Sequence, residues 1–273
     1  MTSRENKKRY LKYVERADLT SDQKNSKAHV AMSHMLARPF VFFDLGQTLV
    51  DESDFINYFD ERFLEILNGF GARIDKRNYL SVRNSVIRDR RIGHGSVIEL
   101  VHEVSRLLTS PGFEDSIASK IYPEIEKGRK SFFRFAPDAP EMLAALAKMQ
   151  VDMGIIANQS LDILDLLDDS GLGKYFKVKV ISSDIKMAKP ELQIFEYALL
   201  KAGRPASECV MVGDRLDTDI CPATSLGMTT IRYTNSLFVL QEPVNDCERA
   251  TYSVKSLSEI PALVERIISQ RRL

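Results

Sequence analysis

The sequence of 273 residues lacks the features of several protein classes. Lysine and arginine total 38, and so do aspartate and glutamate, so the formal net charge is zero. A chain without excess charge has no general electrostatic attraction to nucleic acid or membranes. No apolar run approaches the roughly 20 residues of a membrane-spanning helix, and the N-terminus lacks the apolar core of a secretory signal. We therefore expect a cytoplasmic protein without nucleic-acid or membrane partners.

Cysteine and histidine are also scarce, with three and four residues. The cysteines are odd in number and lack metal-binding spacing, and the histidines form no zinc-binding pattern. Cys209 and Cys221 flank a predicted strand, where a small buried apolar residue is a better interpretation than a reactive thiol. Hydrophobic residues, at 44%, are sufficient for the core of one large or two modest domains.

The N-terminal half contains two segments without strands. Residues 1–38 are a polar, basic N-terminal extension, which we interpret as solvated or loosely docked rather than as a nucleic-acid-binding arm. Residues 53–135 have apolar residues at three- and four-residue steps, which indicates helices. Besides a helix with apolar residues from Phe55 to Leu67, we expect helices at 76–91, 96–108 and 113–127. This segment is predicted to form a helical cap.

Residues 39–52 and 136–273 have the pattern of an α/β core, in which strands alternate with helices. The predicted strands are 40–43, 151–157, 178–182, 209–213, 229–233 and 252–254. The predicted helices are 140–149, 161–170, 191–202, 220–226 and 257–271. The run 40–43 is wholly apolar, as expected for a strand in a parallel sheet covered on both faces. The fold class is predicted to be α/β, with a Rossmann-like parallel sheet and an inserted all-helical cap.

Three motifs place polar residues at the carboxyl edge of this sheet, where such folds bind ligands. The first strand ends in Asp44, the triplet Ala188-Lys189-Pro190 precedes a helix, and the strand 209–213 leads into Asp214 and Asp219. The combination resembles the haloacid dehalogenase superfamily. Most members of that family hydrolyse phosphate esters through an aspartyl-phosphate.

The resemblance implies a role for each motif. Asp44 would be the nucleophile, and Lys189 would neutralise charge between Asp44 and the phosphate. Mg²⁺, which prefers oxygen ligands, would be the cofactor, and its predicted ligands supply carboxylate or main-chain oxygens: Asp44, Gly46, Asp214 and Asp219. Asp219 would orient a metal-bound water, and Asp217 could share that role. An alternative for Thr218 or Asp219 is the N-cap of a helix beginning at residue 220.

Phosphate binding departs from the family pattern. The family's second motif is a strand ending in a serine or threonine that binds phosphate, and Ala157 takes that place here. The predicted phosphate-binding residues are polar side chains near strand ends: Thr48, Asn158, Gln159 and Lys189. Asn158 and Gln159 would bind phosphate near a helix start, or they would form a turn with Ser160 as the N-cap.

The first motif lacks its usual proton donor. The family pattern is Asp-x-Asp-Gly-Thr, whereas this chain reads Asp44-Leu45-Gly46-Gln47-Thr48. General acid–base catalysis is worth roughly two to four decades in rate, so loss of the acid should slow phosphate esters with poor leaving groups most. Asp51 and Glu52 follow closely. Either one of them substitutes for the missing acid, or both are solvated loop acids.

The resemblance predicts a Mg²⁺-dependent phosphatase that acts on a small phosphate ester. The missing acid leaves two alternatives: a metal-independent dehalogenase-type hydrolase, or a binding or regulatory protein with a weakened site. A basic cluster in the predicted cap comprises Arg88, Arg90, Arg91 and His94. It could bind an anionic substrate, or it could be a solvated helix end that complements the helix dipole.

Overall fold

The computed structural model describes residues 38–94 and 96–271. The predicted N-terminal extension therefore lies outside the described residues, except for Arg38. In the described part, no helix combines the length and apolar character needed to cross a membrane.

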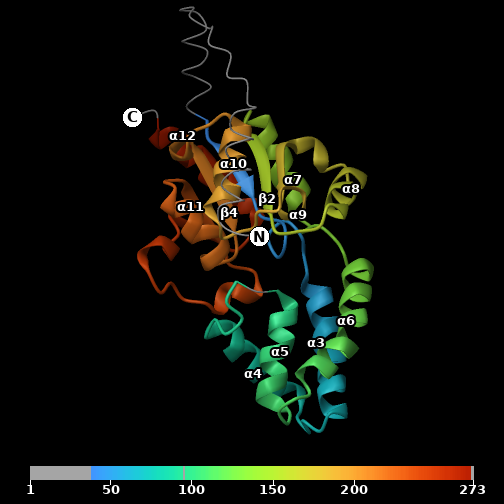
Figure 1. The fold of residues 1–273 in the computed structure, drawn as a ribbon. Helices are drawn as coiled ribbons and strands as arrows, with labels where there is room; N and C mark the ends of the chain where they lie inside the picture. The colour runs from blue at the N-terminus through green and yellow to red at the C-terminus, as the bar shows by residue number, and fades with distance from the viewer. Residues whose placement is uncertain (1–37, 95, 272–273) are drawn as a thin grey trace, which may run out of the picture.

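Six parallel strands form one sheet in the order β3-β2-β1-β4-β5-β6. They are β1 (Phe40–Phe43), β2 (Asp152–Ala157), β3 (Phe176–Ile181), β4 (Cys209–Gly213), β5 (Thr229–Tyr233) and β6 (Tyr252–Val254). The chain runs outward from β1 to β3 and then returns to β4 on the other side of β1 (Figure 1). The β1–β4 boundary is therefore the topological switch point at which ligands bind in such sheets.

Both faces of the sheet are covered. Alternate residues of β1 point to opposite sides, so Val41 and Phe43 join one apolar cluster and Phe40 and Phe42 join another. The first cluster includes residues of α7 (Ala139–Lys148), α8 (Asp162–Asp169) and α12 (Ile260–Gln270). The second includes residues of α10 (Leu192–Ala202) and α11 (Cys221–Ser225). The wholly apolar sequence of β1 follows from this burial.

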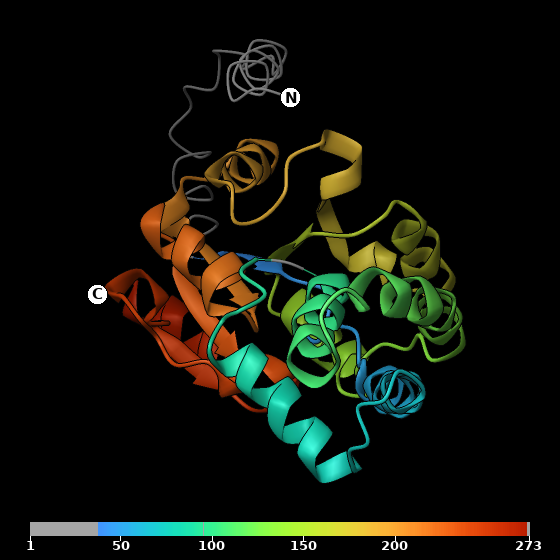
Figure 2. The ribbon, with the colours of Figure 1, turned by 60° about the horizontal axis from the view of Figure 1, so that its bottom comes forward.

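Four further helices, which we call the cap helices, lie between β1 and α7 in the chain. They are α3 (Ser53–Gly69), α4 (Lys76–Arg88), α5 (Val97–Leu108) and α6 (Glu114–Ser131). Their buried faces form a third apolar cluster, which includes Phe63, Tyr79 and Ile121. The cap helices lie beyond one end of the sheet in Figure 1 and come forward in Figure 2. Ser96 and Glu99 form a capping box that begins α5.

Several short helices complete the described fold. They are α9 (Ser182–Ile185), η1 (Gly173–Tyr175), η2 (Ala206–Glu208), η3 (Leu216–Ile220), η4 (Leu237–Leu240), η5 (Asp246–Glu248) and η6 (Leu257–Glu259). The helix predicted at 220–226 begins earlier than expected, because the π-helical turn η3 precedes α11. The helix predicted at 76–91 ends at Arg88.

The interpretation of Cys221 as a small buried apolar residue is wrong. Cys221 and Cys247 form a disulfide, with an S–S distance of 2.00 Å. The chain returns after β5 to place η5 against α11, and this brings together two cysteines 26 positions apart. Cys209 is a buried free cysteine, as predicted.

Candidate active site

Three carboxylates meet at the switch point of the sheet. Asp44 follows β1, Asp214 follows β4, and Asp219 lies in η3. The Asp44 amide donates to the Val212 carbonyl at 2.9 Å, which ties the two strand ends together. One oxygen from each carboxylate lies within 4.8 Å of the others. The sequence motifs are thus close in space, as the parallel topology predicts.

Asp219 approaches the strand end closely because residue 213 is a glycine. A β-carbon on Gly213 would lie 2.5 Å from Asp219 Cγ, closer than real structures allow. Asp219 Oδ2 accepts a hydrogen bond from the Arg215 main-chain N–H at 3.0 Å. The N-cap alternative for Asp219 and Thr218 is therefore wrong, since Ile220 occupies that position and no side chain caps α11.

Lys189 joins two of the three acids. Its buried Nζ donates to Asp44 Oδ1 and to Asp219 Oδ1, at 2.6 Å in each case. The Asn158 side chain fixes the lysine main chain, donating to the Lys189 carbonyl at 2.9 Å and accepting from its amide at 2.8 Å. Asn158 therefore positions Lys189, a role that the sequence did not reveal.

The prediction of Ser160 as an N-cap is wrong. Leu161 occupies the N-cap position of α8, and no side chain caps this helix. The Ser160 hydroxyl instead donates to the Asp162 carboxylate, two residues along the chain.

The acids raise one another's pKa values. Burial is the main cause of a pKa for Asp214 well above its ordinary range, and Asp219 and Asp44 raise it further. Burial also raises the pKa of Asp219 to about 6, although Lys189 opposes the change. Burial alone would lower the pKa of Lys189, but Asp219 and Asp44 reverse that effect and raise it.

The acid cluster has the chemistry of a cation site. Asp214 Oδ2 is buried and has no hydrogen-bond partner among the described residues. Buried carboxylates are ordinarily paired or bound to a metal. One lysine shared between Asp44 and Asp219 leaves negative charge uncompensated, and oxygen ligands suit a hard divalent cation. The residues present therefore fit a metal ion.

A cavity of about 270 Å³ lies between this cluster and the cap helices. The core contributes Asp44, Gly46, Asn158, Gln159, Lys189 and Asp214 to its lining. The cap contributes apolar side chains such as Phe55 and Phe59, and two arginines, Arg83 and Arg129. Arg83 is paired with Asp60 inside the cap. Nothing in the sequence pattern distinguished Arg129, on α6, from other basic residues of the cap.

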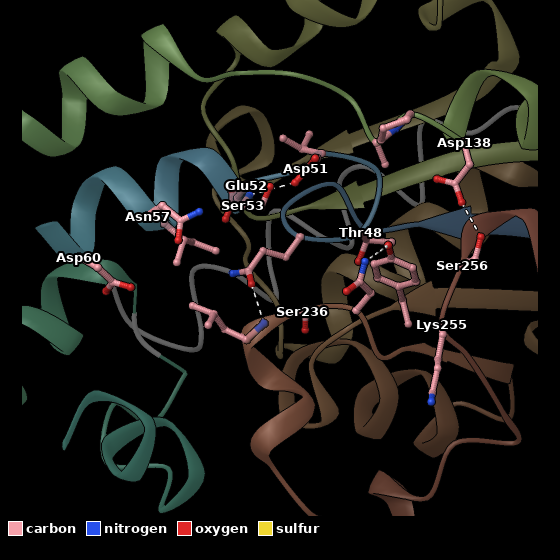
Figure 3. Close-up of a pocket in the computed structure, with 18 of the residues that line it drawn as sticks. Thr48, Asp51, Glu52, Ser53, Asn57, Asp60, Asp138, Ser236, Lys255 and Ser256 are labelled. Atoms are coloured by element: carbon pink, nitrogen blue, oxygen red, sulfur yellow. Dashed lines mark hydrogen bonds between the residues drawn. The ribbon is translucent and has the colours of Figure 1, made fainter. Parts of the chain in front are cut away.

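Thr48 lines a different cavity. This second cavity, of about 550 Å³, is lined by Thr48, Asp51 and Glu52 among others, but not by Asp44 (Figure 3). Thr48 is buried, and its hydroxyl has no hydrogen-bond partner in the described part of the chain. The structure thus separates Thr48 from the other predicted phosphate-binding residues.

The carboxyl group of Glu52 lies close to Gly46. A β-carbon on Gly46 would lie 3.6 Å from Glu52 Oε1 and 3.7 Å from Gln159 Nε2. Gly46 lies outside the left-handed region, whereas Gln47 adopts it with φ 51°. The Gln47 side chain accepts a hydrogen bond from the Leu237 amide at 2.9 Å, which fixes this turn against η4.

The pKa values of Asp51 and Glu52 are shifted in opposite directions, although the two residues are adjacent in the chain. Burial raises the pKa of Glu52 to about 7; Arg129 opposes this change, and Asp44 adds to it. Burial also acts on Asp51, but hydrogen bonds from Ser53 and Arg134 outweigh it and lower that pKa. The solvated-acid interpretation is therefore wrong for the partly buried Glu52.

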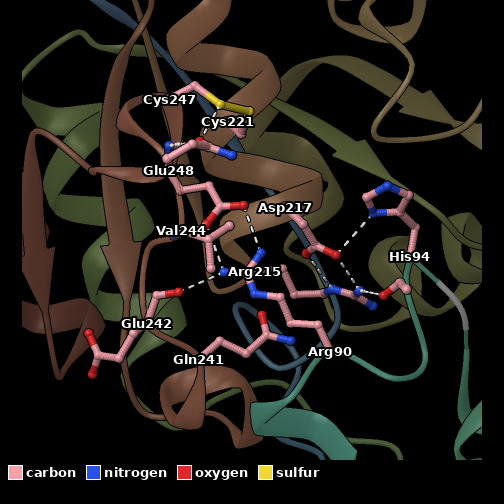
Figure 4. A network of polar contacts seen from close by, with 12 residues as sticks. Arg90, His94, Arg215, Asp217, Cys221, Gln241, Glu242, Val244, Cys247 and Glu248 are labelled. Atoms are coloured by element: carbon pink, nitrogen blue, oxygen red, sulfur yellow. Dashed lines mark hydrogen bonds and ion pairs between the residues drawn. A yellow bond between two sulfur atoms is a disulfide. The ribbon is translucent and has the colours of Figure 1, made fainter.

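Two residues of the basic cluster of the cap, Arg90 and His94, contact the core, whereas Arg88 and Arg91 are exposed. The Arg90 guanidinium forms two hydrogen bonds with the Glu248 carboxylate, both at 2.7 Å (Figure 4). His94 Nδ1 lies 3.0 Å from Asp217 Oδ2, and the Arg215 side chain donates to the Gly93 carbonyl at 3.0 Å. The solvated-helix-end interpretation is wrong for Arg90. Asp217 contacts the His94 ring and accepts hydrogen bonds from the Arg215 side chain; the water-orienting role suggested for it stays a prediction.

Comparison with known proteins identifies the family. A model of the haloacid dehalogenase-like hydrolases matches residues 40–227. A glyceraldehyde 3-phosphate phosphatase of Methanocaldococcus jannaschii is 26% identical over 228 residues, covering 83% of this chain and 97% of the relative. The pyrimidine 5'-nucleotidase YjjG of Escherichia coli is 30% identical over 200 residues, covering 70% of this chain and 84% of the relative.

A solved structure shows the same fold. The HAD phosphatase from Thermococcus onnurineus superposes with a TM-score of 0.55 at 23% identity, covering 83% of this chain and 97% of that one. The sheet order, the helical insertion and the family match agree with one another. The chain therefore belongs to the haloacid dehalogenase-like hydrolases.

Proposed function

We propose that this protein is a Mg²⁺-dependent phosphatase that hydrolyses a small phosphorylated metabolite through an aspartyl-phosphate on Asp44. The observation that carries the proposal is the cluster of Asp44, Asp214 and Asp219 at the switch point, with Lys189 bonded to two of them. The M. jannaschii relative is named a phosphatase of a small sugar phosphate and the E. coli relative a 5'-nucleotidase, and both names support this substrate class.

Each residue has a distinct task in the proposed reaction. Asp44 attacks phosphorus, and Lys189 holds the Asp44 carboxylate while reducing its repulsion of the phosphate. Asp44, Asp214, Asp219 and the Gly46 carbonyl would hold Mg²⁺, which when bound neutralises phosphate charge. The amide of Gln159 lies in the same cavity and can donate to a phosphate oxygen. The apolar cap side chains above the cluster exclude water.

The dehalogenase alternative fits the acid cluster less well. A halide leaves without a proton and needs no metal, so such an enzyme has no cation to offset the repulsion among three buried carboxylates. Burying Asp214 beside two other acids raises its pKa and destabilises its charged form. A bound cation offsets this cost, and the acid cluster therefore favours the metal-dependent reaction.

A panel of phosphorylated metabolites, assayed with Mg²⁺ and with a chelator, tests the proposal. We expect phosphate release in Mg²⁺ alone, and we expect Asp44→Asn to abolish it, because the nearly isosteric amide is a poor nucleophile. Lys174→Gln, which changes a lysine remote from the cavity, is the control and should retain activity. Substantial turnover by folded Asp44→Asn would disprove the covalent route, and hydrolysis that persists in the chelator would disprove the metal requirement.

A further inference from the structure

The first motif lacks a carboxyl side chain at residue 46, but the carboxyl group of Glu52 lies beside that position. An aspartate at residue 46 would carry its carboxyl oxygens two bonds beyond the β-carbon. Glu52 Oε1 lies 3.6 Å from that β-carbon position, so the Glu52 carboxyl group is in contact with the place where such a side chain would begin. Glu52 lines the same cavity as Asp44 and reaches it from the segment that leads into α3.

Asp51, the other candidate acid, is bound by groups outside the cavity. Asp51 accepts hydrogen bonds from the Ser53 amide at 2.9 Å and from Arg134 Nε at 3.0 Å, and it does not line the cavity that contains Asp44. These donors hold Asp51 in its charged form, which has no proton to give. Of the two acids that the sequence left open, the structure places only Glu52 at the reacting centre.

The surroundings of Glu52 suit a proton donor at neutral pH. Burial raises its pKa to about 7, where a catalytic acid is most effective. The groups that face it are the Arg129 guanidinium and the Gln47 side chain, which lower the pKa, and the Asp44 and Asp51 carboxylates, which raise it. A phosphorylated substrate places its leaving oxygen on the side of the phosphorus opposite Asp44, which is the side covered by the cap.

We propose that Glu52 is the general acid and base of this enzyme and replaces the aspartate missing at residue 46. The proposal rests on the phosphatase function proposed above. In the first step, Asp44 forms a bond to phosphorus, the bond from phosphorus to the leaving oxygen breaks, and that oxygen takes the proton from Glu52. In the second step, Glu52 takes a proton from water as the water oxygen attacks the aspartyl-phosphate, which releases phosphate and regenerates both carboxyl groups.

The test compares two substrates in the presence of Mg²⁺. An alkyl phosphate needs a proton on its leaving oxygen, whereas p-nitrophenyl phosphate does not. In Glu52→Gln, kcat/KM for the alkyl phosphate should fall by roughly a hundredfold or more, while kcat/KM for p-nitrophenyl phosphate changes little. Because the second step also needs Glu52, the variant should release nitrophenol in a burst of one equivalent and then turn over slowly.

A compensating variant separates catalysis from structure. Gly46→Asp in the Glu52→Gln background places a carboxyl group at the family position and should restore most of the alkyl phosphate activity. Asp51→Asn is the matched control and should keep the wild-type ratio of alkyl to aryl kcat/KM. Equal loss of both substrates in Glu52→Gln, or an unchanged ratio, would overturn the assignment. Hydrolysis of p-nitrophenyl phosphate by the wild type separately tests the phosphatase function.

Discussion

Replacing Glu52 by glutamine should make the protein more stable at alkaline pH, in contrast to the usual effect of removing a buried polar group. The pKa of Glu52 rises from an ordinary value of 4.5 to about 7 on folding. The folded protein therefore binds this proton more tightly than the unfolded chain does. The charged form destabilises the fold, and this penalty is absent below pH 4.5 and complete above pH 7.

The pKa change sets the size of the effect. Between pH 5 and pH 8.5 the wild type should lose roughly 2–3 kcal/mol of unfolding free energy through Glu52, because one pKa unit corresponds to about 1.4 kcal/mol. Glutamine does not titrate, so this loss is missing in Glu52→Gln. For a protein of this size, each kcal/mol shifts the melting temperature by about 2–4 °C. The melting temperature of the variant, relative to that of the wild type, should therefore rise by several degrees from pH 5 to pH 8.5.

Thermal unfolding of both proteins in a chelator, at intervals from pH 5 to pH 8.5, measures the difference. Asp214 and Asp219 also titrate with raised pKa values, but they are present in both proteins and largely cancel. Asp51→Asn is the control. The pKa of Asp51 is lowered from 3.8, so its stabilising effect is complete throughout this range and the difference should stay flat. A flat difference for Glu52→Gln as well would refute the raised pKa of Glu52.

Three further substitutions test the positions of other groups. Asp214→Asn should raise the melting temperature in a chelator, because it relieves repulsion in the acid cluster, and should reduce the stabilisation given by Mg²⁺; an unchanged Mg²⁺ titration would contradict its role as a ligand. Asn158→Ala removes two hydrogen bonds to the Lys189 main chain, so it should cost roughly 2 kcal/mol of stability and lower kcat more than it changes KM; kinetics equal to wild type would show that Lys189 needs no such support. Arg90→Ala removes the cation paired with the buried Glu248 carboxylate, which keeps only its hydrogen bond from the Val244 amide. The substitution should cost on the order of 2 kcal/mol in chemical denaturation. Adding Glu248→Gln should recover part of that loss, whereas additive effects would mean that the pair does not interact.

The fold was predictable because its main signals are local. The apolar run of β1 and the three- and four-residue periodicity of α3 each depend on residues close together in the chain. The parallel topology then requires that Asp44 and Asp214 meet at one edge, which made the acid cluster predictable from the positions of strand ends. The beginning of α11 was harder to predict, since the π-helical turn η3 before it is closed by main-chain hydrogen bonds from Asp219 and Ile220 to the Arg215 carbonyl, which no residue pattern indicates.

Contacts between distant segments account for what sequence reasoning missed. The bonds of Arg90 to Glu248 and of Cys221 to Cys247 depend on how the loop after β5 returns to the rest of the chain. The Glu52 carboxyl lies beside Gly46 because the chain turns back between β1 and α3. A six-residue separation gives no sign of that approach, so the sequence left Asp51 and Glu52 equivalent.

The contact between Arg90 and Glu248 also bears on how ligands enter and leave. The cap helices and the core together line the candidate cavity, so any separation of the two during product release would break this ion pair. His94 and Asp217 add a contact that is exposed on the histidine side. The Arg90 guanidinium is partly exposed, so its ion pair with Glu248 is sensitive to ionic strength. Added salt should therefore speed the separation of the cap helices from the core. It should leave the rates of the chemical steps in the cavity unchanged. An enzyme limited by product egress would then turn over faster in salt, and one limited by chemistry would not.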